Sequence, residues 1–234
     1  DQGFRVVLVE REQQLGGQLR HPRPAVRAID FHQLLTDTVR AVETHPLIEC
    51  LLGAEVDEVG GYVGQFHTRL RKADGAMAEV EHGAIVVASG GRAVETEAYG
   101  CGALPGVVTQ RAFEAWLAGS DEPGVARQEL AGGVVMIQCV GSRQPGRPYC
   151  SRVCCTEALQ NALHVKAIDP SLSVTVLYRD LRSYGFREAL YRQAREQGVR
   201  FLQYALEDPP EVSASGDGLS VQLRVQPEGM PVEL

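Results

Sequence analysis

The sequence predicts an α/β fold in which helices cover parallel sheets and a small antiparallel β meander is attached. Short apolar runs typical of buried strands alternate with segments of helical spacing, which is the pattern of parallel sheets. Between about residues 48 and 81, short strand patterns follow one another directly, which is typical of antiparallel pairing. The chain has 234 residues, of which 44% are hydrophobic, so it can form one large domain or two small ones around a sizeable core.

The first half of the chain begins with an apolar run over residues 4–9, which predicts a strand covered on both faces. Helical spacing of apolar residues predicts a helix over residues 29–42, which Pro46 ends. Short strands are expected at 48–52, 54–59, 62–71 and 76–81, with turns at Gly60–Gly61 and Asp74–Gly75. A buried strand at 84–88 should then lead into Ser89-Gly90-Gly91.

The second half repeats the α/β alternation after a short helix that Thr109 should cap and that extends to Leu117. Strands are expected at 133–138, 172–178 and 199–204, and helices from about 150 to 167 and from 186 to 197, with Gly198 as C-cap. The pattern of the tail after Pro209–Pro210 predicts antiparallel strands, of which the segment 219–225 is the clearest. With a polar boundary at 118–128, the expected domains are 1–128, 129–208 carrying a cysteine cluster, and the return strands 209–234.

Composition excludes several classes of protein. The net charge is −7, which gives no general attraction to nucleic acid or to an anionic membrane. No apolar run approaches the ~18 residues that a membrane span needs, and the start of the chain lacks a secretory pattern. Six cysteines are too few for a disulfide scaffold of this size. We therefore expect a cytoplasmic protein with a metal or redox site.

Four of the cysteines are predicted to meet at one point. Cys139 ends a strand, while Cys150, Cys154 and Cys155 open the expected helix. Residues four apart share a helical face, so Cys150 and Cys154 should point the same way, with Cys139 approaching from the strand end. The carboxyl edge of a parallel sheet is where ligands bind, and the helix dipole together with Arg143, Arg147 and Arg152 would favour an anionic group there.

Several kinds of cysteine site fit this spacing. An iron-sulfur cluster uses four thiolates and is the interpretation that we favour. Structural zinc usually has two close pairs of cysteines, and buried free cysteines are common. The vicinal pair Cys154–Cys155 could act as a redox dithiol, which would leave Cys139 and Cys150 without a role. Cys50 and Cys101 stand alone and are interpreted as core or surface residues.

A second pattern lies near the start of the chain. Glu10 ends the first strand, where dinucleotide-binding folds place an acidic residue that binds ribose hydroxyls. The pair Gly16–Gly17 would let a cofactor pass close to the backbone. A glycine-rich phosphate loop is expected ~20 residues before such an acidic residue, so the chain is interpreted as a fragment that lacks it.

The remaining polar residues give weaker signals. The six histidines are scattered without ligand spacing and are interpreted as surface or core residues. A run of arginines is interpreted as a solvated face, with a docking surface for an acidic partner as the alternative: Arg179, Arg182, Arg187, Arg192, Arg195 and Arg200. Cys139-Val140-Gly141-Ser142-Arg143 has one glycine, so no nicotinamide site is expected after that strand.

Several motifs resemble one family over nearly the whole chain. They are Ile137–Arg143, Tyr149–Cys155, Leu177–Asp180, Tyr184–Glu188 with Tyr191–Arg192, Val9–Glu12 with Leu15–Gly17, and Glu58–Phe66. Together they resemble the heterodisulfide reductase A-subunit family. The resemblance implies a partial flavoprotein with two dinucleotide-binding domains, similar to thioredoxin reductase, that binds FAD and a [4Fe-4S] cluster. Members pass electrons between the flavin and iron-sulfur partners, and some perform flavin-based bifurcation.

The resemblance also assigns residues. Cluster ligation maps onto Cys139, Cys150, Cys154 and Cys155. The FAD contacts map onto Glu10 and Arg11 at the ribose, onto Gly16, Gly17 and Gln18 near the diphosphate and flavin, and onto Ala88, Ser89 and Gly90. Implied partners are other iron-sulfur subunits of a heterodisulfide-reductase-like complex and ferredoxin or hydrogenase-type donors.

The sequence also departs from part of the family. It lacks the additional cysteines after the Gly-Gly segment and the inserted ferredoxin domain of the methanogen-type members, so it is more similar to the shorter bacterial ones. No catalytic acid or base is predicted, because outer-sphere electron transfer needs none. The alternatives are an NAD(P)H-dependent disulfide reductase using Cys154–Cys155 and a non-catalytic metal-binding module.

Overall fold

The computed structural model describes residues 2–21, 31–119, 123–227 and 229–234. By its contacts the chain divides into two compact units, with the division between Arg92 and Ala93. This division lies upstream of the polar stretch 118–128, part of which forms the short helix α3 (Pro123–Glu129). Each unit is described by itself.

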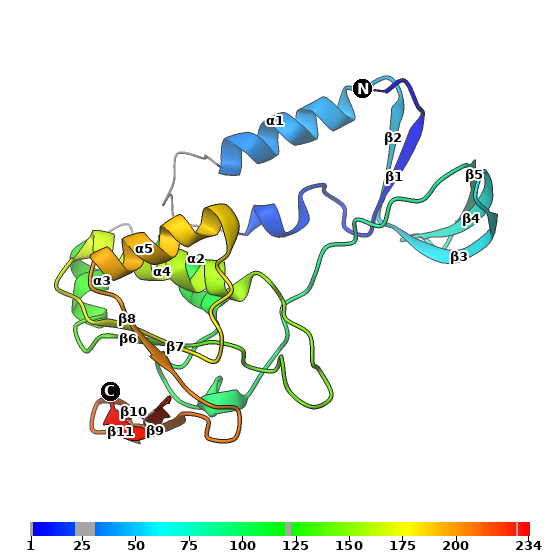
Figure 1. Ribbon diagram of the computed structural model, residues 1–234. Helices are drawn as coiled ribbons and strands as arrows, with labels where there is room; N and C mark the ends of the chain where they lie inside the picture. Colours follow the sequence, from blue (N-terminus) through cyan, green and yellow to red (C-terminus); the bar gives the residue numbers. More distant parts are fainter. Residues whose placement is uncertain (1, 22–30, 120–122, 228) are drawn as a thin grey trace. The chain divides into compact units, whose positions relative to one another are not determined.

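The first unit contains a parallel strand pair and an antiparallel meander (Figure 1). β1 (Val6–Glu10) pairs in parallel with β2 (Ile48–Leu52), and α1 (Phe31–Glu43) lies between them in sequence. The expected helix covers the same segment, although its first two positions, 29 and 30, fall outside the described residues. β2 therefore belongs to the parallel pair and not to the meander.

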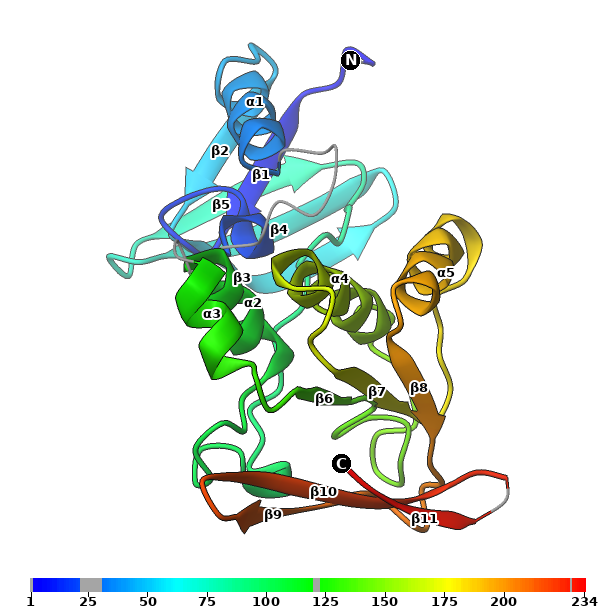
Figure 2. The same cartoon turned by 90° about the vertical axis from the view of Figure 1, so that its left-hand side faces the viewer.

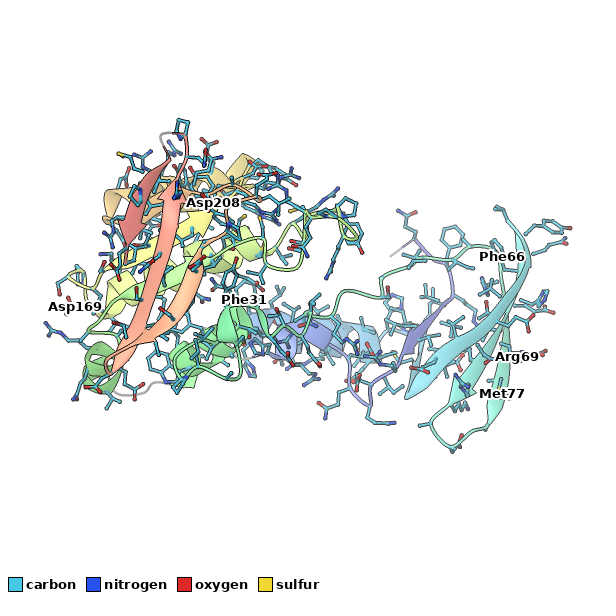
Figure 3. All side chains as sticks on the ribbon, turned by 90° about the horizontal axis from the view of Figure 1, so that it is seen from below. Phe31, Phe66, Arg69, Met77, Asp169 and Asp208 are labelled. Carbon is cyan, nitrogen blue, oxygen red and sulfur yellow. The ribbon has the colours of Figure 1, made fainter. Side chains whose placement is uncertain are left out.

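The meander consists of β3 (Ala54–Tyr62), β4 (Gln65–Lys72) and β5 (Met77–His82), all antiparallel. Figure 3 shows Phe66, Arg69 and Met77 on this sheet. The predicted turn at Gly60–Gly61 is wrong, because β3 continues through both glycines. A Cβ at Gly61, where φ is +89°, would lie 2.1 Å from the carbonyl oxygen of Gln65, so glycine lets the two strands approach.

The predicted buried strand at 84–88 is also wrong. Residues 83–97 form no helix or strand, and Val86 is 88% exposed. The sequence has the apolar character of a strand, but among the described residues no neighbouring strand pairs with this segment. Hydrophobicity alone does not form a strand unless another strand satisfies its backbone hydrogen bonds.

The second unit has three layers (Figure 2). Its central sheet consists of β6 (Val134–Ile137), β7 (Val174–Tyr178) and β8 (Arg200–Gln203), all parallel as predicted. One face packs against α2 (Gln110–Gly119), α4 (Cys154–Ile168) and α5 (Glu188–Glu196) through a core that includes Leu159 and Val176. The hydroxyl of Thr109 accepts from the Ala112 N–H at 3.1 Å, which confirms the predicted cap of α2.

The other face of the central sheet packs against the C-terminal sheet. That sheet contains β9 (Glu211–Ser215), β10 (Gly218–Val225) and β11 (Met230–Glu233), all antiparallel as expected. Leu177 of β7 packs here with Val221 and Leu223 of β10. The predicted α/β class is therefore confirmed, with parallel sheets, covering helices and a small antiparallel meander.

Three short 3-10 helices complete the described elements: η1 (Gly17–Arg20), η2 (Ala98–Gly100) and η3 (Gly185–Arg187). The C-cap of α5 is Gln197, and Gly198, predicted as the C-cap, follows it with φ +79°, the left-handed conformation common just after a helix. Within the described ranges, none of the helices has both the length and the apolar character that crossing a bilayer requires.

Candidate functional site

The four cysteines lie at the carboxyl edge of the central sheet of the second unit. Cys139 follows β6, Cys150 lies in the loop before α4, and Cys154 and Cys155 form the first turn of α4. Cys139 and Cys155 are buried, whereas Cys150 and Cys154 are half-buried. This is the edge at which parallel sheets bind ligands.

One part of the predicted geometry is wrong. α4 begins at Cys154, so Cys150 is not on the helix and does not share a helical face with Cys154. The backbone of Arg152 adopts a left-handed conformation, with φ +64°, between the two cysteines. A residue in that conformation interrupts a right-handed helix, and the loop positions Cys150 instead.

Each sulfur has its own hydrogen-bond donor. The Arg143 guanidinium lies 3.8 Å from Cys139 Sγ, and the Arg152 N–H donates to Cys150 Sγ at 3.3 Å. The Ser151 hydroxyl lies 3.3 Å from Cys154 Sγ, and the Arg182 N–H lies 3.5 Å from Cys155 Sγ. Donors of this kind stabilise a negatively charged thiolate.

Among the described residues, no three His, Cys, Asp or Glu side chains lie close enough together to bind one metal ion. The four cysteines occupy one edge of the sheet, and because a four-iron cluster binds each thiolate through a different iron, their ligation of such a cluster stays a prediction.

The pKa values of the two vicinal cysteines, Cys154 and Cys155, are shifted in opposite directions. Interaction with the adjacent Cys155 thiol lowers the pKa of Cys154 to about 6. The same interaction, together with burial, raises the pKa of Cys155. Cys154 therefore carries the negative charge of the pair, at the helix N-terminus where the dipole favours an anion.

Arg179 holds the loop that carries Cys139. Its guanidinium donates to the carbonyl oxygens of Arg143 at 2.8 Å and Cys139 at 3.0 Å, and also to that of Ser142. Both Cys139 and Arg143 have positive φ, at +65° and +55°, which is strained for residues other than glycine. Strain of this kind persists only where surrounding contacts fix the backbone, as Arg179 does here.

Sequence reasoning assigned Arg179 to a solvated run of arginines. The structure shows that it is half-buried and bonded to the cysteine loop instead. Its position directly after a strand, within the motif Leu177–Asp180, is a signal that could have identified it, because that position also lies at the carboxyl edge of the sheet.

Several buried polar atoms without partners among the described residues belong to residues that adjoin the cysteines in sequence or contact the Cys139 loop. Gln138 is 1% exposed, and neither oxygen nor nitrogen of its side-chain amide has a hydrogen-bond partner among the described residues. Within the same described ranges, the hydroxyl of Thr156 and the Nε atoms of Arg147 and Arg179 are likewise buried and unpaired. Buried polar groups are normally hydrogen-bonded, so an unpaired group of this size needs an explanation.

A sulfur-rich group at this edge explains these atoms. Met136 of β6 packs against Leu159 of α4, and alternation along the strand puts Gln138 on the same face, toward the first turn of α4. Four thiols with donors, together with unpaired N–H and O–H groups beside them, match the chemistry of a cluster ligated by cysteine. The residues present therefore fit such a group in chemistry.

The residues predicted to bind FAD all lie in the first unit. The Glu10 carboxylate accepts the N–H of Glu12 at 2.9 Å, which fixes the turn after β1. Arg11 is exposed and pairs with Glu12 at 3.1 Å. The second carboxylate oxygen of Glu10 has the chemistry to accept a hydrogen bond from a ribose hydroxyl.

The two predicted glycine segments are joined by a side chain. The Gln18 amide donates at 2.8 Å to the carbonyl oxygen of Gly91, the residue that directly follows Ala88, Ser89 and Gly90. Gly17 is exposed, and nothing lies within 4 Å of the place that a Cβ would take. At Gly16 a Cβ would lie 2.6 Å from the Leu35 side chain, so packing against α1 also requires glycine there.

Comparison with known proteins identifies relatives. No protein-family model matches the chain. The iron-sulfur A-subunit of the CoB–CoM heterodisulfide reductase of Methanocaldococcus jannaschii is 28% identical over 89% of this chain and 46% of its own length. The A-subunit of the H2:CoB–CoM heterodisulfide,ferredoxin reductase of Methanothermobacter marburgensis is 35% identical over 67% of this chain and 24% of its own length. The chain thus spans about half, or less, of these curated relatives.

A solved structure shows the same fold. The bacillithiol disulfide reductase Bdr (YpdA) from Bacillus cereus matches with a TM-score of 0.50 and 14% identity, over 99% of this chain and 68% of that chain. Several curated relatives carry the same subunit name, and the matches cover most of the chain. The motifs at the cysteine edge and in the first unit, together with these relatives, show that the chain belongs to the heterodisulfide reductase A-subunit family.

Proposed function

We propose that the chain is the FAD- and cluster-binding part of an electron-transfer flavoprotein that works within a heterodisulfide-reductase-like complex. In this proposal Cys139, Cys150, Cys154 and Cys155 ligate a [4Fe-4S] cluster. The observation that carries it is the cysteine edge of the second unit, where each of four thiols has its own donor and the neighbouring residues Gln138 and Thr156 have buried side-chain polar atoms without partners among the described residues.

FAD binding is assigned to the first unit. Glu10 and Arg11 would hold the adenosine ribose, and Gly16, Gly17 and Gln18 would lie along the diphosphate and flavin, with Ala88, Ser89 and Gly90 opposite. The bond from Gln18 to Gly91 supports this assignment because it links the two glycine segments. When bound, a flavin supplies two-electron and one-electron transfer, and a cluster supplies one-electron transfer.

The protein's own residues set the conditions for electron transfer. Arg179 fixes the loop of Cys139, and N–H and O–H groups directed at sulfur favour the more negative, reduced form of any centre held there. Burial of Cys139 and Cys155 excludes water from part of the site. We infer that the electron partners are iron-sulfur proteins. The names of relatives include ferredoxin, which is such a protein, and also H2, which implies a hydrogenase-type donor. Flavin-based bifurcation is a further part of the proposal.

The test is anaerobic purification of the full-length protein, followed by visible absorption and by iron, acid-labile sulfide, zinc and flavin analysis. We expect about four iron and four sulfide atoms per cluster. Serine at any of the four predicted ligands should remove most of the iron. Serine at Cys50 should leave it unchanged, because that cysteine lies on β2 of the first unit. A colourless protein that contains zinc would overturn the proposal.

The lowered pKa of Cys154, directly beside Cys155 in the first turn of α4, favours a second candidate, a dithiol that reduces disulfides. In that case NAD(P)H would bleach the flavin of an iron-free preparation, and disulfide reduction would require only Cys154 and Cys155 among the four cysteines. Serine at Cys139 or Cys150 distinguishes the two candidates, because it should abolish cluster binding but leave a dithiol reaction intact.

A further inference from the structure

We propose that the second unit carries a docking surface for a small acidic electron-carrier protein of the ferredoxin class. The surface, here called the arginine–aromatic patch, consists of Tyr149, Arg152, Val153, Tyr184, Phe186 and Arg187. The inference rests on the proposed function, because it assigns a place where the partner of the cysteine edge would bind.

The patch is formed by two loops that hydrogen bonds hold together. The Arg187 guanidinium donates to the carbonyl oxygen of Arg152 at 3.3 Å, which joins η3 to the loop before α4. The Arg182 N–H lies 3.5 Å from Cys155 Sγ, and Arg143 pairs with Asp180 at 3.4 Å. These contacts bring the loop before α4 beside the segment 180–187 within this unit.

The apolar members of the patch are exposed. Phe186 is fully exposed, Tyr149 is 65% exposed and Tyr184 is 63% exposed. Single exposed apolar residues are common, but a group of aromatic side chains next to arginines has the composition of an interface centre. Aromatic residues and arginine also supply most of the residues that dominate binding energy.

The charge around the cysteines is opposite to that of the whole chain. Residues 139–157 and 179–188 contain six arginines and three carboxylates, whereas the chain has a net charge of −7. Asp180 is already paired with Arg143 and Arg182. Arg152 and Arg187 are exposed at the surface, so the patch attracts an acidic partner and accelerates its association.

The patch lies directly against the proposed ligands. The backbone N–H of Arg152 donates to Cys150 Sγ at 3.3 Å, and Val153 directly precedes Cys154. A carrier bound to the patch would therefore place its redox centre next to the cysteine edge. A second copy of this chain fits less well, because a two-fold contact would put the arginines of one patch against those of the other.

The test is calorimetric titration of the anaerobically purified full-length protein with an acidic bacterial 2[4Fe-4S] ferredoxin. We expect Phe186→Ser and Arg187→Glu each to raise the Kd about tenfold or more. Two matched substitutions at exposed residues outside the patch, Tyr62→Ser and Arg224→Glu, should change it less than about twofold. Binding should weaken as salt increases.

The iron content of the same preparations separates the two proposals. Iron-containing protein that does not bind ferredoxin, or that binds it equally well in the Phe186 and Arg187 variants, overturns the docking proposal alone. Iron-free protein that binds ferredoxin through the patch supports docking and overturns the cluster. Loss of a homodimer in the Phe186 variant, measured by sedimentation, would assign the patch to a second copy and overturn the docking proposal.

Discussion

Replacement of Gln138 by leucine tests the cysteine edge most directly, because it should have a separate measurable effect on each form of the protein. It should raise the stability of the cluster-free form and lower the reduction potential of the cluster-containing form. The Gln138 side chain is buried, and neither polar atom of its amide has a partner among the described residues. Leucine has a similar size and no polar atoms, so Gln138→Leu removes an unsatisfied amide without leaving a cavity.

In the cluster-free protein this substitution should be stabilising. An unsatisfied buried polar group costs about 1–3 kcal/mol, so the free energy of unfolding should rise by an amount of that order. For a chain of this size, 1 kcal/mol corresponds to about 2–4 °C in the melting temperature. The measurement is thermal unfolding of the iron-free protein, followed by circular dichroism.

In the cluster-containing protein the same substitution should lower the reduction potential. A hydrogen bond donated by the Gln138 amide to a sulfur would favour the more negative, reduced state, and leucine cannot donate one. If the two redox states differ by about 1.4 kcal/mol in the strength of this bond, the one-electron potential falls by about 59 mV. A redox titration monitored by electron paramagnetic resonance measures this change.

Thr175→Val is the matched control. The Thr175 hydroxyl is also buried and unpaired within the described residues, but it lies on β7 and faces the C-terminal sheet, on the opposite side from Val174 and Val176. Valine should stabilise the cluster-free protein and leave the potential unchanged. The reasoning about Gln138 is refuted if Gln138→Leu destabilises the cluster-free protein, or if it changes the reduction potential no more than Thr175→Val does.

Three further predictions concern other parts of the chain. Arg179→Lys should reduce the iron content several-fold at unchanged secondary structure, measured by iron analysis and circular dichroism, because lysine cannot replace a planar guanidinium that binds three carbonyl oxygens. Gly61→Ala should destabilise the first unit by about 2 kcal/mol or more in urea unfolding, because its Cβ would meet the Gln65 carbonyl oxygen at 2.1 Å, whereas Gly83→Ala makes only an ordinary contact at 3.7 Å. Hydrogen bonds from Ser171 lower the pKa of Asp169, so the carboxylate stabilises the fold above its unfolded pKa of about 3.9 and the effect is lost as the pH falls through the lower folded value. Urea unfolding of Asp169→Asn should therefore show a deficit at pH 7 that shrinks below about pH 4, and a deficit independent of pH would contradict this assignment.

Much of the fold could be predicted from the sequence because its signals are local. The spacing of apolar residues identified β1, β2, the three central strands of the second unit and its helices α2, α4 and α5, and Thr109 and Gly198 marked two helix ends; α3 was missed because its segment has the polar composition of a linker. A helix or strand forms where neighbouring residues prefer it and present one apolar face, and both properties are visible in a short window. The same local information failed at residues 84–88, because a strand also needs a paired neighbour.

The sequence by itself determined the family, the four cysteines at the end of one strand and the start of one helix, and the order of the elements. Only the tertiary structure decided that Cys150 lies off the helix, that Arg179 binds the Cys139 loop from 40 residues away, and that the Gln138 amide is buried without a partner among the described residues. These features depend on hydrogen bonds and burial between segments far apart in the chain. Local periodicity carries no information about which distant atoms meet, so the surroundings of the cysteines could be established only from the folded arrangement.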